Sequence, residues 1–238
     1  MKKRVPFKTV LSGGLWLWYD HMGSMALVNL LWVLFCIPIV TIPVATVGLF
    51  SYGYALLSGR DPGIGSFFSG MKKLWWPAML LGFTNLLLLL ICAVNVVFYL
   101  WKASEWSPLL GMVGAGLFFW VGVMVASLNM YLWPVLCHLN GGIKKVVRVS
   151  FLLGMAHPFL LLWLFLTSLC LTVLGVVSGI GLFLFTSSLS CAFATVAAVA
   201  GLVLYEGTEE GDLITRRFKS LEEDWKKRGL GYIVKPWD

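Results

Sequence analysis

The chain has few charged residues. Of its 238 residues, 18 are Lys or Arg and 11 are Asp or Glu, so that 12% are charged, while 59% are hydrophobic and the mean hydropathy is +0.88. So few charges cannot cover the surface of a folded chain this apolar in water. The composition therefore excludes intrinsic disorder, a disulfide-stapled scaffold and a water-soluble enzyme, and it indicates an integral membrane protein.

Charged residues are also missing from four long stretches of the chain. A hydrocarbon core about 30 Å thick takes roughly 20 helical residues to cross. Backbone polar groups in lipid need internal partners, and the alternating ten-residue pattern of a barrel is missing, so the sequence predicts an all-α, polytopic transmembrane helix bundle. The uncharged stretches are residues 21–59, 74–101, 106–143 and 149–205.

The four stretches hold five or six crossings, and the first stretch decides the number. Pro38 and Pro43 interrupt it, and a Pro inside a helix removes a hydrogen bond and clashes one turn back. Two crossings here would each reach only about 25 Å, so one kinked span and a re-entrant hairpin are the alternatives. The expected spans are residues 24–40, 43–58, 77–101, 108–132, 157–178 and 181–205.

The distribution of Lys and Arg favours six spans. Short cytoplasmic loops collect basic residues, and external loops do not. With six spans and both termini in the cytoplasm, Lys102 is the only basic residue left outside, whereas both five-span arrangements leave several outside. We therefore expect a multi-pass protein with cytoplasmic termini and cytoplasmic basic connectors.

Two of these connectors have the pattern of amphipathic helices. In the second connector, one predicted face holds Ile143, Val146, Val147 and Phe151, while the basic residues project elsewhere. Basic residues beside spans usually set orientation alone, so a simple topology signal is the alternative to contacts with anionic lipid or a partner. The candidate contacts are Lys72, Lys73, Lys144, Lys145 and Arg148.

The composition divides the chain into a bundle, residues 1–205, and a short charged tail, residues 206–238. In the tail, one helical stripe holds Ile214, Phe218, Leu221 and Trp225. We expect a short amphipathic cytoplasmic helix there. Its stripe rests on the membrane, on the protein's own bundle or on a partner, and the sequence does not decide between these.

No group of residues indicates catalysis or metal binding. The three His and five Cys show no C-x-x-C or H-E-x-x-H spacing. The adjacent Cys137 and His138 lie at a predicted helix end, where we expect His138 to meet terminal carbonyls. We expect no enzyme activity, no metal, no cofactor and no nucleic-acid partner.

The expected spans contain Asn but no Asp, Glu, Lys or Arg. Ion and proton relays need titratable groups at bilayer depth, so this absence argues against a proton-driven pump, a voltage sensor and an acid–base membrane hydrolase. Hydrogen bonding between helices explains the Asn residues, at about 1 kcal/mol each, and a path for a solute is the alternative. The candidate intramembrane polar contacts are Asn29, Asn85, Asn95 and Asn129.

Several strings occur in a familiar order along the chain. They are Asn29–Thr41 (NLLWVLFCIPIVT), the Phe-Phe-x-x-x-Lys-Lys connector at Phe67–Lys73, Tyr131–Pro134 (YLWP) and the dipeptide His157–Pro158. Over about residues 11–205 the chain resembles the YesL-like family of bacterial membrane proteins. The resemblance implies a plasma-membrane protein of Gram-positive bacteria, often encoded beside carbohydrate ABC uptake and sensor genes, and it implies no catalytic residues.

Two functions fit these observations. The first is a non-catalytic accessory or assembly partner of a carbohydrate uptake system, in contact with the lipid bilayer and with ABC permease subunits or a membrane sensor. The second is a small facilitative transporter or channel that passes a neutral solute along Asn, Ser and Thr side chains. The first explains the missing intramembrane charge more simply. Association of the chain with a second copy, as a homo-oligomer, is left open.

Overall fold

The structure is a computed structural model that describes residues 7–58, 63–102, 107–139, 142–178, 186–205 and 213–228. Every regular element in these ranges is a helix, which confirms the predicted all-α fold. The elements are α1 (Phe7–Asp20), α2 (Met22–Cys36), the 3₁₀ helix η1 (Ile39–Thr41), α3 (Ile42–Ser58), α4 (Gly65–Lys102), α5 (Pro108–Leu139), α6 (Ile143–Ala156), α7 (Pro158–Ser178), α9 (Thr186–Tyr205) and α10 (Leu213–Arg228).

Five helical segments of the described chain are long and apolar enough to cross a membrane. The helix α2 is not among them, because its 15 residues extend only about 22 Å. It ends at Cys36 and not at residue 40, since Pro38 is extended (ψ 112°) and has no N–H with which to continue the helix. The five segments are Ile39–Ser58, Gly65–Lys102, Pro108–Leu139, Pro158–Ser178 and Thr186–Val203.

The helices α4 and α5 are longer than the sequence predicts. The first basic connector is not a separate segment, because α4 begins at Gly65 and continues through Pro77. Likewise α5 continues through Pro134 and ends at Leu139, whereas the sequence predicts an end at residue 132. Pro is tolerated inside membrane helices where neighbouring groups satisfy the freed carbonyl. The expected start of the last span, residue 181, lies outside the described residues.

The helix α1 is an element that the sequence analysis does not predict. It buries Val10, Trp16 and Leu17 and packs mainly along α9. Glycine allows this approach, since a Cβ on Gly14 would lie 2.2 Å from the ring of Phe193. The segment therefore belongs to the core of the bundle.

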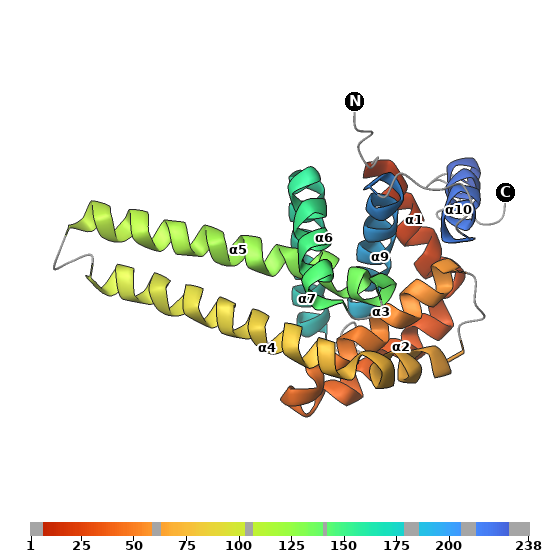
Figure 1. Cartoon of the computed structure of the whole chain (residues 1–238), viewed down its shortest axis with the longest axis horizontal. Coiled ribbons are helices and arrows are strands. Elements are labelled where there is room, and N and C mark those ends of the chain that lie inside the picture. Colours follow the sequence, from red (N-terminus) through yellow and green to blue (C-terminus); the bar gives the residue numbers. More distant parts are fainter. Residues whose placement is uncertain are drawn as a thin grey trace.

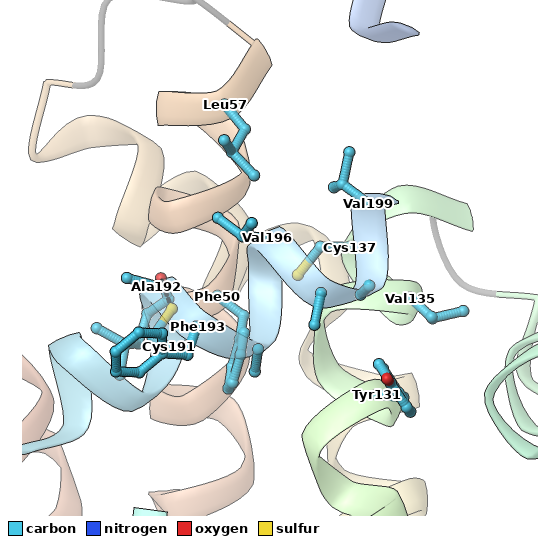
Figure 2. Close-up of a cluster of buried hydrophobic side chains, with 14 of the residues drawn as sticks. Phe50, Leu57, Tyr131, Val135, Cys137, Cys191, Ala192, Phe193, Val196 and Val199 are labelled. Atoms are coloured by element: carbon cyan, nitrogen blue, oxygen red, sulfur yellow. Dashed lines mark hydrogen bonds between the residues drawn. The ribbon is translucent and has the colours of Figure 1, made fainter. Parts of the chain in front are cut away.

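The helix α9 is the centre of the bundle. In its most apolar stretch 78% of the residues are buried. Figure 2 shows Cys191, Ala192 and Val196 of this helix in the cluster that also holds Phe50 of α3 and Tyr131 of α5. Small side chains along α9 let the neighbouring helices come close, which favours van der Waals packing in a membrane bundle.

The helices α4 and α5 form an arm that extends away from the bundle (Figure 1). They lie side by side and contact each other more than any other pair of helices does. In the most apolar stretch of each, only 11% of the residues are buried, so most of the arm surface is open to lipid or to other membrane helices. The arm runs crosswise to α7 and α9, and the two sets of helices would meet a flat bilayer at different angles.

The tail helix α10 rests on the bundle, against α1 and α3. Its Phe218 and Trp225 are 4% and 2% exposed. The apolar stripe predicted from the sequence thus faces the protein's own helices. The residues expected to cap this helix, Asp212 and Gly229, lie outside the described residues.

Candidate functional site

A groove of about 610 Å³ lies between α4, α5 and α6. Most of its wall is apolar. Two cations, an amide and two hydroxyl groups are also part of it. The lining residues are Leu81, Thr84, Asn85, Leu88, Val125, Leu128, Leu132, Ile143, Lys144, Val147, Arg148, Ser150 and Phe151.

Packing of α6 against the bundle turns its two cations toward this groove. Val146, Val149 and Leu153 are buried and recur at helical spacing, so they form the inner face of α6. Lys144 and Arg148 lie one turn apart on another side, where both are exposed and line the groove. The two basic residues and the apolar wall therefore form one amphipathic site.

The face of α6 predicted from the sequence is wrong in part. The prediction groups Val147 and Phe151 with Val146, but these two side chains are 46% and 52% exposed and line the groove beside the cations. The reason is that α6 has two apolar sides. One packs against the bundle, and the other forms part of the groove wall.

Asn85 joins the groove to the inside of the arm. Its Nδ2 donates a hydrogen bond of 2.8 Å to Oδ1 of Asn129, which links α4 to α5. The Nδ2 of Asn129 also lies 3.4 Å from the carbonyl oxygen of Val125 and 3.3 Å from that of Ala126. These bonds satisfy most of the polar atoms of the pair inside the arm.

The other two Asn residues lie away from the groove. Asn29 is fully buried, and its Oδ1 accepts a 3.1 Å hydrogen bond from the backbone N–H of Ser188 near the start of α9. Asn95 donates a 2.8 Å hydrogen bond to the carbonyl oxygen of Ile91 on its own helix. The structure therefore does not gather the four Asn residues into a single polar path.

Three of the five basic candidates do not line the groove. Lys72 and Lys73 are exposed on α4, before the part of that helix that lines the groove. Lys145 is exposed on α6 but lies off the groove. The structure thus divides the basic residues into a pair at the site and three outside it.

Ser150 is a site residue that the sequence analysis misses. It is 1% exposed, it lines the groove, and its Oγ has no hydrogen-bond partner. Position 150 follows Val146 by one turn, so helical periodicity places it on the inner face once Val146 is known to be buried. A buried hydroxyl without a partner is costly, which makes Ser150 a candidate ligand contact.

His138 lies in the last turn of α5, at the helix end that the sequence predicts. Its Nδ1 lies 3.0 Å from the hydroxyl of Tyr54, so it links the end of α5 to α3. The adjacent Cys137 is buried, and its Sγ lies 3.4 Å from the Oγ of Ser51. In the described ranges, no three side chains of His, Cys, Asp or Glu gather into a set that could hold a metal ion.

The helices and the groove define an integral membrane protein with an amphipathic groove on its side. Residues 25–96 match DUF624, a family of proteins of unknown function. The match covers most of α2, all of η1 and α3, and most of α4. No curated protein and no solved structure matches the chain.

Proposed function

We propose that this membrane protein is a non-catalytic accessory protein that acts by contacting other membrane components. Its place would be the plasma membrane of a bacterium, with both termini in the cytoplasm. Its partner would be a carbohydrate uptake system, through the ABC permease subunits or a membrane sensor, as the YesL-like resemblance implies.

The observation that carries this proposal is the uncovered arm of α4 and α5. These helices have 38 and 32 residues, more than the roughly 20 that a crossing needs. Large apolar side chains are exposed along them, such as Val97 (66%) and Leu117 (60%). An arm of this kind offers a long surface to the helices of a neighbouring membrane protein, where close packing drives association.

A facilitative transporter or channel for a neutral solute is the second candidate. The groove supports it, because Asn85 and Ser150 place polar groups beside the arm. The hydrogen bond between Asn85 and Asn129 opposes it, because this bond uses amide groups that a solute path would need. The accessory function is therefore the better fit.

Native copurification and flux in liposomes distinguish the two functions. We expect the full chain to copurify with permease subunits from its host membrane and to move no sugar after reconstitution. Saturable sugar flux without copurification, abolished by Asn85→Leu or Asn129→Leu in a folded protein, would replace the accessory function with transport.

Substitutions on the arm test which surface the partner uses. Val97→Trp adds bulk at an exposed position of the arm, and we expect it to weaken copurification. Val177→Trp is the matched control, because Val177 is 81% exposed on α7, outside the arm. Equal loss in both variants would show that the arm is not the contact surface.

A further inference from the structure

We propose that the groove between α4, α5 and α6 binds one anionic phospholipid. Its acyl chain would lie along the apolar wall, and its phosphate would lie between Lys144 and Arg148. This binding site goes beyond the accessory function and does not depend on it.

The cations supply the charge that such a headgroup needs. Lys144 and Arg148 are both exposed at the groove, and neither has an ion-pair partner among the residues that the structure describes. The guanidinium of Arg148 presents paired donors that match phosphate oxygens, and the ammonium of Lys144 adds a second positive charge one turn away. Two unpaired cations beside an apolar wall are complementary to an anionic amphiphile.

Ser150 provides an independent indication of a ligand. Its Oγ is buried without a hydrogen-bond partner, although a helical Ser commonly bonds to the carbonyl oxygen four residues earlier. Leaving a buried hydroxyl unsatisfied costs free energy, which a ligand oxygen in the groove would remove. The glycerol and ester oxygens of a phospholipid lie next to its phosphate and can fill this role.

The extent of the apolar wall favours a lipid over a free phosphate. A second cavity of about 660 Å³ adjoins the groove, between α5, α6 and α7, and both are lined by Val125, Leu128 and Phe151. Together they form an apolar path that leads away from the cations. A free phosphate needs only the cationic end, whereas an acyl chain fills the remainder by burying apolar surface.

Lipid titration followed by native mass spectrometry tests the site. The purified full chain is titrated with phosphatidylglycerol or with phosphatidylcholine of the same chain length, and bound lipids are counted. We expect at least tenfold tighter retention of one phosphatidylglycerol. The double variant Lys144→Gln, Arg148→Gln should lose about 30-fold in that affinity, because each cation near an anionic lipid surface contributes about fivefold.

The neighbouring Lys145 provides the matched control. Lys145→Gln removes the same charge from the same helix but off the groove, so we expect phosphatidylglycerol affinity to change less than twofold. Ser150→Ala should lower the affinity about fivefold through the lost hydrogen bond. Val147→Trp fills the groove from an exposed position, so it should block binding in a protein that still folds.

Four results would overturn the site. Equal retention of phosphatidylglycerol and phosphatidylcholine would show that the site does not select a charged headgroup. Equal loss of phosphatidylglycerol affinity in Lys145→Gln and Lys144→Gln would mean that the lipid is attracted to the basic surface in general and not to the groove. Displacement of the lipid by equimolar glycerol phosphate would mean a free-phosphate site. Unchanged affinity in Ser150→Ala would place the headgroup elsewhere. None of these measurements bears on sugar flux or copurification, so failure of the site is separable from failure of the accessory function.

Discussion

The amide of Asn85 donates a 2.8 Å hydrogen bond to the side-chain oxygen of Asn129, and this contact joins the two helices of the arm. The two helices also meet at the stacked rings of Tyr99 and Phe118, and the Asn pair adds a polar contact to this mostly apolar surface. Polar contacts of this kind in membrane bundles contribute about 0.6 kcal/mol on average and up to about 1.7 kcal/mol.

The first prediction concerns the stability of this contact. Asn85→Leu and Asn129→Leu should each lower the free energy of unfolding by about 1 kcal/mol, and a double-mutant cycle should give a coupling close to the same value. Unfolding in mixed micelles measures both. Asn95→Leu is the control, because Asn95 bonds only within α4, and it should show no coupling to Asn129. Coupling near zero between Asn85 and Asn129 would contradict the hydrogen bond.

The second prediction concerns the close approach of α1 to α9. A Cβ at position 14 would lie 2.2 Å from the ring of Phe193, so Gly14→Ala should destabilise the bundle by about 1–3 kcal/mol. Gly14→Ala should cost less when it is made in a Phe193→Ala protein than in the parent protein, because the ring that the new methyl group meets is then gone. Thermal unfolding in detergent measures these changes.

An open glycine on the arm provides the control for this prediction. Nothing lies within 4 Å of a Cβ at position 116, so Gly116→Ala should be neutral or stabilising by up to about 1 kcal/mol, as Ala favours helix. If Gly14→Ala behaved like Gly116→Ala, the packing of α1 on α9 would be wrong.

The sequence predicts the all-α fold and many helix boundaries because these depend on local signals. For example, α7 runs over Pro158–Ser178, where the sequence predicts 157–178. Long uncharged runs indicate helices in lipid, and Pro or a charge marks their ends. These signals do not require knowledge of neighbouring helices.

The missed features depend on neighbouring helices instead. The helix α1 carries Gly13 and Gly14 where a core helix usually carries large apolar residues, and only the positions of Trp225 and Phe193 explain them. The residues of the groove between α4, α5 and α6 are a second example of features that depend on neighbouring helices. The sequence indicates Lys144, Arg148 and Asn85 as separate candidates, but only the packing of α6 against α4 and α5 places them at one groove and brings Ser150 there.

The third prediction concerns the tip between α2 and α3. Ile37 and Ile39 are 73% and 77% exposed there, which suits hydrocarbon and not water. The break between α2 and α3 leaves backbone carbonyl groups without helical partners, and Thr41 satisfies two of them. Its Oγ1 donates to the carbonyl oxygen of Pro38 at 2.7 Å and also to that of Phe35, so these groups need no water. Because α2 is only about 22 Å long, it ends inside a hydrocarbon core that is about 30 Å thick. We therefore expect a re-entrant hairpin and not two full crossings.

Cysteine labelling in intact cells tests this tip. In a variant whose five native Cys are replaced by Ala, Ile39→Cys should resist a membrane-impermeant maleimide from both sides of the membrane. Ser107→Cys, at the start of α5 and at the tip of the arm, should be labelled from outside under the proposed orientation, and Ser69→Cys only after the cells are opened. Labelling of Ile39→Cys from outside would establish two full crossings.

The fourth prediction concerns the attachment of the tail helix to the bundle. Trp225 is 2% exposed, and its ring lies so close to α1 that a Cβ at position 13 would meet it at 2.5 Å. A 3.2 Å hydrogen bond from Thr9 to Glu222 adds a polar contact between the same two helices.

Trp225→Ala should therefore weaken docking of α10 by about 3–5 kcal/mol, the usual cost of removing a buried aromatic side chain. Amide hydrogen exchange along α10 should become at least tenfold faster, with the exchange of α9 unchanged. Lys219→Ala removes an exposed side chain from the same helix and should leave exchange as it is. Equal exchange in the Trp225→Ala variant and the parent protein would mean that the tail helix is held by contacts other than this ring.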